Sequence, residues 1–105
     1  MQVLFKSRHP NATDLRDLTE TRVRFVLRRL GWLVPRAEVQ MSDVNGPRGG
    51  VDKRCRVEFR TDGGGSVVVA AVARNWRTAL DDALARAMRF LLRARRRRND
   101  VRVVR

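Results

Sequence analysis

The sequence predicts an α+β fold: a two-layer β-α-β-β-β-α sandwich with a four-stranded sheet and both helices on one face. Four segments carry strand patterns, namely residues 1–7, 37–43, 53–60 and 66–73. Residues 13–30 and 75–98 instead repeat apolar side chains at helical spacing. No internal repeat or long linker divides the 105 residues, a length that suits one compact domain. We therefore expect a domain over residues 1–98 and a loose basic tail over residues 99–105.

The first predicted strand is followed by the first predicted helix, which a glycine ends. Val3 and Phe5 share one face of the strand. Thr13 or Asp14 can cap the helix, and Gly31 can end it after Leu30. The predicted apolar stripe of this helix consists of Leu15, Thr19, Val23, Val26 and Leu30, widened by Leu18 and Phe25. The crossover to residues 37–43 should make the first two strands parallel or near neighbours.

The three later strands are joined by two glycine-rich connections. Residues 61–65, Thr-Asp-Gly-Gly-Gly, predict a hairpin turn. Residues 45–50 contain the letters GPRG, but they lack the Lys-Ser/Thr of a phosphate-binding P-loop, and they join two strands, whereas the GxxG loop of a KH domain joins helices. We interpret them as a hairpin loop. Arg54 and Arg56 should lie on the sheet face away from the helices.

The last predicted helix combines an apolar side with an arginine-rich side. Its apolar stripe consists of Trp76, Leu80, Ala83, Leu84, Ala87 and Leu91. From Arg86 to Arg98 there are seven arginines and no acidic residue. One face of this helix should pack on the sheet, and the other should be free to bind an anion.

The charge of the whole chain points to a polyanionic partner. The formal net charge is +13 and the isoelectric point is about 11.8, so the chain repels itself unless a polyanion binds it. Nucleic acid is the leading candidate. Of the 24 basic residues 22 are arginine, which favours bidentate phosphate contacts, although a GC-rich genome would produce the same bias.

The remaining composition argues against several other classes. The single cysteine, Cys55, allows no intramolecular disulfide, should pack in the core and fits the cytoplasm. The N-terminus does not resemble a signal peptide, and no segment has the length and apolarity of a membrane span. His9 is interpreted as a turn residue, and Trp32 and Trp76 as packing residues and not as base-stacking ones. No nucleophile and base pair up and the acidic residues are scattered, so we expect no enzyme, metal, cofactor or small-molecule substrate.

The candidate RNA-binding residues follow from helical spacing and local charge. Arg86, Arg89 and Arg93 recur opposite the apolar stripe, with Asp82 placed to pair with Arg86 at i,i+4. Arg96 and Arg97 continue this face, although residues 95–98 also read as a solvated helix end. Lys53 and Arg54 supplement the basic surface at the start of the third strand.

Several segments together resemble the ribosome hibernation promoting factor family, also described as ribosome-associated inhibitors or sigma-54 modulation proteins. The resemblance covers nearly the whole chain. It rests on Leu15-Arg16-Asp17, on residues 43–50 (DVNGPRGG) running into residues 52–57 (DKRCRV), on Ala79-Leu80-Asp81 and on the element order. The chain resembles the short members, which end soon after the second helix and lack a dimerisation domain.

This resemblance implies a cytoplasmic bacterial protein, non-enzymatic and monomeric when free, that silences ribosomes in stationary phase or under stress. It implies binding to the small ribosomal subunit and its ribosomal RNA, in the channel used by messenger RNA and transfer RNA. The family's RNA-contacting basic positions match Arg22 on the first helix and Arg86, Arg89 and Arg93 on the second.

Two alternatives remain open at the level of sequence. From the first helix onward, the order α-β-β-β-α resembles a double-stranded-RNA-binding domain, which would make the protein a general duplex RNA or DNA binder. A small nuclease or phosphotransfer enzyme using carboxylates such as Asp43 and Asp52 ranks far behind.

Overall fold

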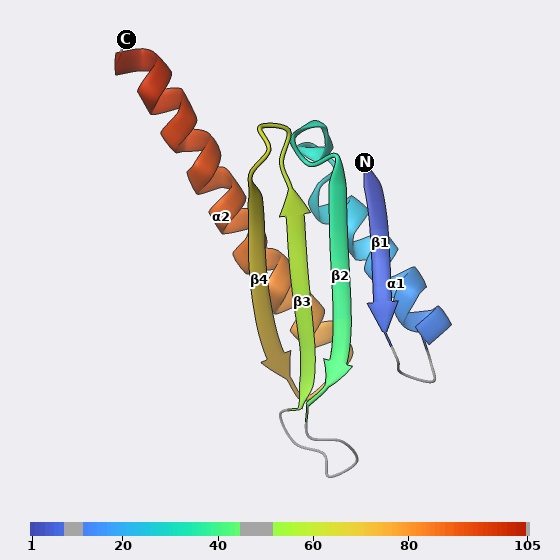
Figure 1. Cartoon of the computed structure of the whole chain (residues 1–105). Coiled ribbons are helices and arrows are strands. Elements are labelled where there is room, and N and C mark those ends of the chain that lie inside the picture. The colour runs from blue at the N-terminus through green and yellow to red at the C-terminus, as the bar shows by residue number, and fades with distance from the viewer. Residues whose placement is uncertain (8–11, 45–51, 105) are drawn as a thin grey trace.

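The computed structural model forms one sheet with two helices behind it (Figure 1). It describes residues 1–7, 12–44 and 52–104, and within these ranges all side chains except those of residues 12–13 and 96–104. The elements are β1 (Gln2–Ser7), α1 (Ala12–Val26), the 3-10 turn η1 (Gly31–Leu33), β2 (Arg36–Asp43), β3 (Lys53–Arg60), β4 (Ser66–Ala73) and α2 (Trp76–Val104). The predicted fold class and element order are confirmed.

The sheet has the order β1-β2-β3-β4, so the strands lie side by side in chain order. β1 pairs with β2 in parallel, whereas β2–β3 and β3–β4 are antiparallel, as the helical crossover and the two hairpins require. The registers place Val39 opposite Val57 and Val57 opposite Val69. Apolar side chains from the three strands therefore reach the same face of the sheet.

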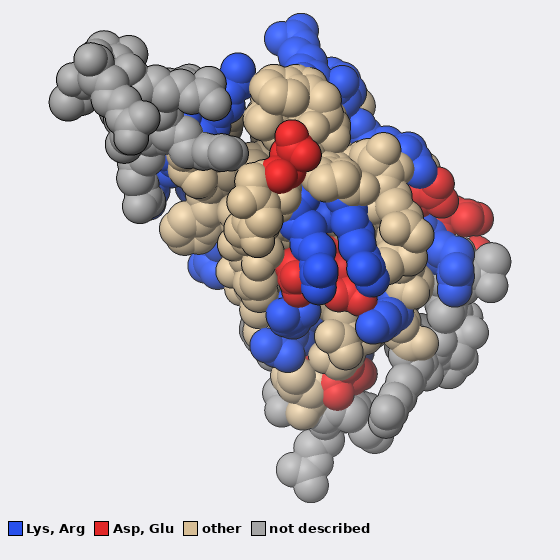
Figure 2. Space-filling model, turned by 45° about the horizontal axis from the view of Figure 1, so that its top comes forward, with Lys and Arg blue, Asp and Glu red and all other residues tan. Residues whose placement is uncertain are grey.

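The face away from the helices carries ionic side chains. Glu38 and Glu58 lie opposite each other on β2 and β3. Lys6 Nζ lies 2.9 Å from Glu38, and Arg56 and Arg60 each lie 3.4 Å from Glu58. The hydrogen bond from Lys6 lowers the pKa of Glu38, against the opposing effect of partial burial. Figure 2 shows blue basic side chains lying across red acidic ones in the middle of the molecule. This face is at least partly solvated, as expected.

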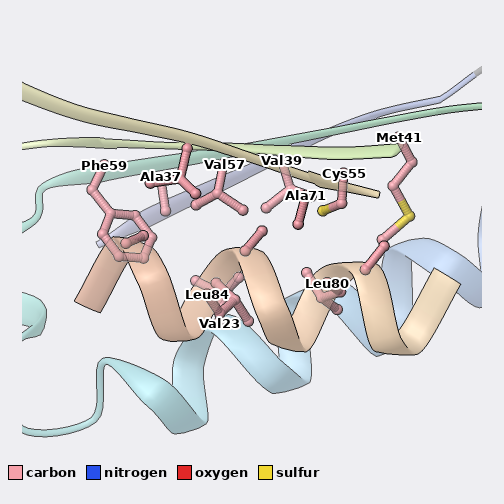
Figure 3. Packing of buried hydrophobic residues seen from close by; sticks show 14 of the residues in the cluster. Val23, Ala37, Val39, Met41, Cys55, Val57, Phe59, Ala71, Leu80 and Leu84 are labelled. Atoms are coloured by element: carbon pink, nitrogen blue, oxygen red, sulfur yellow. The ribbon is translucent and has the colours of Figure 1, made fainter. Parts of the chain in front are cut away.

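The core lies between the sheet and α2, with α1 beside it (Figure 3). From β2 and β3 it takes Ala37, Val39, Met41, Cys55, Val57 and Phe59, all buried. From α2 it takes Leu80, Ala83, Leu84, Ala87 and Leu91, also buried, while Trp76 packs half-buried at the margin. The predicted stripe of the last helix is therefore the one that packs.

The first helix differs from its prediction at both ends and on one face. It begins at Ala12, so Thr13 and Asp14 lie inside it and are not its caps. It ends at Val26 and not at Leu30, because backbone bonds from Arg28 N to Phe25 O (3.3 Å) and from Leu30 N to Leu27 O (3.0 Å) tighten the chain into turns. Leu27, which is not part of the predicted stripe, is the buried side chain at this end of the helix. Phe25, predicted to widen the stripe, is 53% exposed.

The turns and the C-terminal helix complete the comparison. Residues 61–65 form the predicted hairpin turn, in which Gly64 adopts a φ of 87° that other residues rarely accept. α2 continues to Val104, past the expected end at Arg98, since residues 76–104 contain no glycine or proline to stop a helix. The predicted loop over residues 45–50 and His9 lie outside the described residues. None of the described helices is long and apolar enough to span a lipid bilayer.

Replacing Leu84 by alanine should lower the free energy of unfolding by about 2–5 kcal/mol, because it leaves a cavity beneath the sheet. Urea denaturation would measure the change. The matched control is Leu92→Ala on the same helix, where the side chain is exposed and the change should stay within about 0.5 kcal/mol. Equal losses for the two variants would contradict the described rotation of α2.

Cys55 should resist alkylation in the native protein. Burial raises the pKa of its thiol to about 12, so at pH 8 only on the order of one molecule in 10⁴ carries the reactive thiolate. Mass spectrometry after iodoacetamide treatment should find no adduct in native buffer and a single adduct in guanidinium chloride. Rapid native labelling would show that the thiol is accessible.

Candidate nucleic-acid interface

The long helix α2 is anchored at its start and extends past the sheet at its end. The Asn75 side chain accepts a hydrogen bond from Thr78 N at 2.8 Å, which caps the first turn. At 1.5 Å per residue its 29 residues span about 43 Å, whereas an eight-residue strand spans about 27 Å. Figure 1 accordingly shows α2 running beyond the end of the sheet. Ala87 and Leu91 are still buried, so the helix leaves the packed body only after Leu91.

Arg86, Arg89 and Arg93 lie exposed on α2, away from its buried stripe, as predicted. Arg86 Nη1 donates to the carbonyl of Ala70 on the edge strand β4 at 3.2 Å, instead of pairing with Asp82. The Arg93 guanidinium lies 5.5 Å from the centroid of the Phe90 ring. None of the three arginines forms an ion pair with a carboxylate in the described part of the chain. Their positive charge is therefore uncompensated there.

Arg22 occupies a different position, at the junction of the two helices. Its Nε donates to Asp81 Oδ1 at 3.1 Å, and Arg77 approaches the other oxygen of Asp81 at 3.9 Å. The Arg22 guanidinium also lies 5.6 Å from the centroid of the Phe25 ring. The side chain is about one-third exposed, so part of its charge is neutralised and part faces solvent.

Lys53 and Arg54 do not join the arginines of α2. Lys53 Nζ lies 2.7 Å from Asp43 and 3.5 Å from Asp52, at the end of the sheet where α2 begins. The hydrogen bond to Asp43 raises the pKa of Lys53, which keeps it an ammonium ion with its charge already compensated. Arg54 is exposed on the opposite sheet face. The predicted residues are thus spread over four places: α2, the junction of the two helices, the end of the sheet and its outer face.

The end of α2 contributes Arg95 as well as the predicted Arg96 and Arg97. All three lie on the helix, and the side chains of the latter two are outside the described part of the chain. Arg95 was interpreted as part of a solvated helix end. The side chain is exposed, as that interpretation expects, and its guanidinium also lies 5.4 Å from the centroid of the Trp32 ring. This contact ties the helix to the turn that follows α1.

Trp32 corrects the interpretation of the tryptophans as packing residues. Trp76 does pack against the core, but Trp32 is 66% exposed. The reason is local: in the 3-10 turn the next two residues, Leu33 and Val34, take the inward positions and leave the indole outside. Because residues 32–34 are all apolar, the sequence does not indicate which of the three side chains faces outward.

The described residues provide no metal-binding cluster. In the ranges 1–7, 12–44 and 52–104, no three histidine, cysteine, aspartate or glutamate side chains converge on a common point. Asp43 and Asp52 do lie near each other, but both contact the Lys53 ammonium, and Asp52 is buried. A lysine thus stands where a nuclease would need a divalent cation.

The comparisons with known proteins agree with the architecture. No family model and no curated protein matches the sequence. Among solved structures, a ribosomal subunit interface protein from Coxiella burnetii matches with a TM-score of 0.72 over 90% of this chain and 98% of that chain, at 13% sequence identity. A likeness of this extent shows that the two chains share a fold.

The Arg22–Asp81 pair should contribute about 0.2–1 kcal/mol to the free energy of unfolding, since both side chains are partly exposed. A double-mutant cycle with Arg22→Ala and Asp81→Ala, measured by urea denaturation, gives this coupling energy. It should fall in high salt because solvent ions screen the pair. A coupling of zero at low salt would mean that Asp81 does not hold Arg22.

Proposed function

We propose that the protein belongs to the ribosome hibernation factor family and is a non-enzymatic translation inhibitor. It binds the small ribosomal subunit in the bacterial cytoplasm and occupies the channel of messenger RNA and transfer RNA. The observation that carries the proposal is the row of uncompensated arginines, Arg86, Arg89 and Arg93, on an ordered helix. The fold shared with a ribosomal subunit interface protein suggests which polyanion this row meets.

The physical basis is phosphate binding by a rigid cationic surface. Arginine binds phosphate oxygens in bidentate fashion, and each phosphate that it neutralises releases counterions into solution. Because the apolar stripe fixes α2 against the sheet, the arginines are held in place before binding and lose little freedom on it. Affinity comes from phosphates, and specificity comes from the fit of a two-layer domain into a folded RNA channel.

The candidate residues contribute unequally to this proposal. Arg86, Arg89 and Arg93 provide the main contacts, and Arg96 and Arg97 extend the same helix. Arg22 contributes less than a free arginine, since Asp81 competes for its guanidinium. Lys53 and Arg54 contribute least: the first is bound by two carboxylates and the second lies on the other side of the sheet.

The alternative of a general duplex RNA or DNA binder uses the same phosphate contacts. A competition experiment distinguishes the two functions. Excess duplex RNA should release a duplex binder from ribosomes but should leave a ribosome factor bound. The enzyme alternative receives no support from Asp43 and Asp52, because both contact Lys53. It would require metal-dependent turnover that either Asp→Ala change abolishes.

The test is co-sedimentation with purified small subunits, in the presence of excess duplex RNA and over a range of salt concentrations. The wild-type protein should sediment with the subunits, and its affinity should fall with a log-log salt slope of roughly −3 if about four phosphates are neutralised. The variant R86Q/R89Q/R93Q should lose about 2 units of that slope and leave the subunits at moderate salt. Prior binding of messenger and transfer RNA should also displace the wild-type protein.

The matched control is R36Q/R56Q/R60Q on the outer sheet face. Both triple variants lower the formal net charge from +13 to +10, by removing three arginines each. They differ in the position of the lost charge and in the pairing of Arg56 and Arg60 with Glu58. The control should retain most of the binding. Equal loss of co-sedimentation in both variants would show that net charge and not the α2 surface drives association. Unchanged sedimentation of R86Q/R89Q/R93Q would contradict the proposed site.

A further inference from the structure

We propose that Trp32 and Arg95 form a binding site for an unpaired RNA base and its phosphate. This inference rests on the proposed function and deepens it, because it names a part of the RNA that the protein recognises. It concerns a place where two elements meet: Trp32 belongs to η1, which follows α1, and Arg95 belongs to the projecting half of α2.

The exposure of Trp32 is held by the structure on both sides of it. At 66% it is the most exposed large apolar side chain in the described part of the chain. Leu33 N donates to Leu30 O at 2.9 Å, and Val34 N donates to Gly31 O at 3.1 Å. Leu33 O accepts a hydrogen bond from Asp62 N in the β3–β4 turn at 3.1 Å. The indole is therefore presented to solvent by an anchored turn, at the cost of leaving a large apolar ring in water.

Arg95 supplies the cation beside this ring. Its guanidinium lies 5.4 Å from the indole centroid, within the range of a cation–π contact, and it forms no ion pair with a carboxylate of the described residues. A nucleotide offers the two complementary groups, a flat base for the indole and a phosphate for the guanidinium. The contact places the indole and the guanidinium beside each other.

The other exposed aromatic rings offer less to a base. Phe25 is less exposed than Trp32, at 53%, and the Arg28 guanidinium lies closer to its ring, 4.3 Å from the centroid, held by a 2.8 Å hydrogen bond to the Phe25 carbonyl. Phe90 is 46% exposed and lies 5.5 Å from Arg93, but phenylalanine stacks more weakly than tryptophan. Trp32 has the larger ring and the greater exposure. It is therefore the strongest stacking position on this surface.

The chemistry of stacking selects unpaired RNA over duplex. In an A-form helix the base faces are stacked on one another and are closed to a side chain, whereas loops and single strands can present them. An interface of arginines alone would not make this distinction, since both forms carry phosphates. Trp32 thus gives the basic surface a preference for a single-stranded segment within a folded RNA.

The experiment uses the variant Trp76→Phe, in which Trp32 is the only tryptophan and reports its own contacts by fluorescence. The probes are a short unstructured RNA oligonucleotide, an abasic oligonucleotide of equal length and a duplex of equal length, all at low salt. The single strand should quench the fluorescence, whereas the abasic strand and the duplex should quench it little. Equal quenching by the abasic strand would overturn the proposal, because phosphates alone would then account for the signal.

Affinity supplies the second arm, measured by anisotropy of the labelled single strand with proteins that retain Trp76. The change Trp32→Leu should weaken binding by about 5- to 150-fold, the range of one stacked base, while leaving net charge unchanged. Phe90→Leu removes another exposed ring beside an arginine and should bind as the wild type does. Circular dichroism and urea denaturation verify folding of both. Equal affinity of Trp32→Leu and the wild type would overturn the site.

Sedimentation separates this inference from the function on which it rests. If wild-type protein sediments with small subunits and Trp32→Leu sediments equally well at every salt concentration, the proposed function stands and the stacking site falls. If wild-type protein does not sediment but Trp32 is still quenched by single-stranded RNA, the ribosomal function falls and the stacking site stands.

Discussion

The docking of α2 on the sheet is the interaction on which the rest of the structure depends. Its buried stripe combines large side chains such as Leu80 and Leu84 with small ones such as Ala83 and Ala87, so the helix can approach the strands closely while its leucines fill the space between them. Each buried leucine contributes about 1.5–3 kcal/mol of transfer free energy. This packing fixes the rotation of the helix about its own axis. The directions of Arg86, Arg89 and Arg93 follow from that rotation.

The acidic residues divide the surface into two parts. Over the sheet and the first two turns of α2, carboxylates such as Glu58 and Asp81 lie within reach of two basic side chains each. Beyond Asp82 the chain contains no acidic residue until Asp100. Positive charge is thus balanced locally on the body of the domain and accumulates along the projecting helix. The net charge of +13 therefore produces a positive electrostatic potential that is strongest along α2 and is not spread evenly over the surface.

Much of the fold was predictable because its patterns have one physical meaning. Alternation such as Cys55, Val57 and Phe59 is typical of a strand with one buried face, and the hairpin turn after it requires Gly64. The two failures have different causes. Phe25 lies within α1, about 200° around the helix from the buried Val23, so helical spacing itself turns it outward. Trp32 is followed by Leu33 and Val34, and only the 3-10 turn decides which of the three faces solvent.

The candidate interface was predictable only in part, because some of its contacts join residues that are distant in the chain. Helical spacing alone placed Arg86, Arg89 and Arg93 on an exposed face, because period and burial are linked along one helix. The contacts of Arg95 with Trp32 and of Arg22 with Asp81 join residues distant in the chain. No local pattern encodes such pairs. They depend on how α1 and the turn after it lie beside α2.

The contact of Arg86 with β4 also affects the open edge of the sheet. β4 is an edge strand with exposed Val68 and Val72, a combination that invites pairing with a second sheet. The Arg86 guanidinium occupies the Ala70 carbonyl on that edge, so one acceptor of the open ladder is already bonded. Two copies that met edge to edge would also bring two such cations together. A side chain of the proposed RNA-binding surface thus also leaves the edge of β4 with one acceptor fewer for pairing with a second sheet.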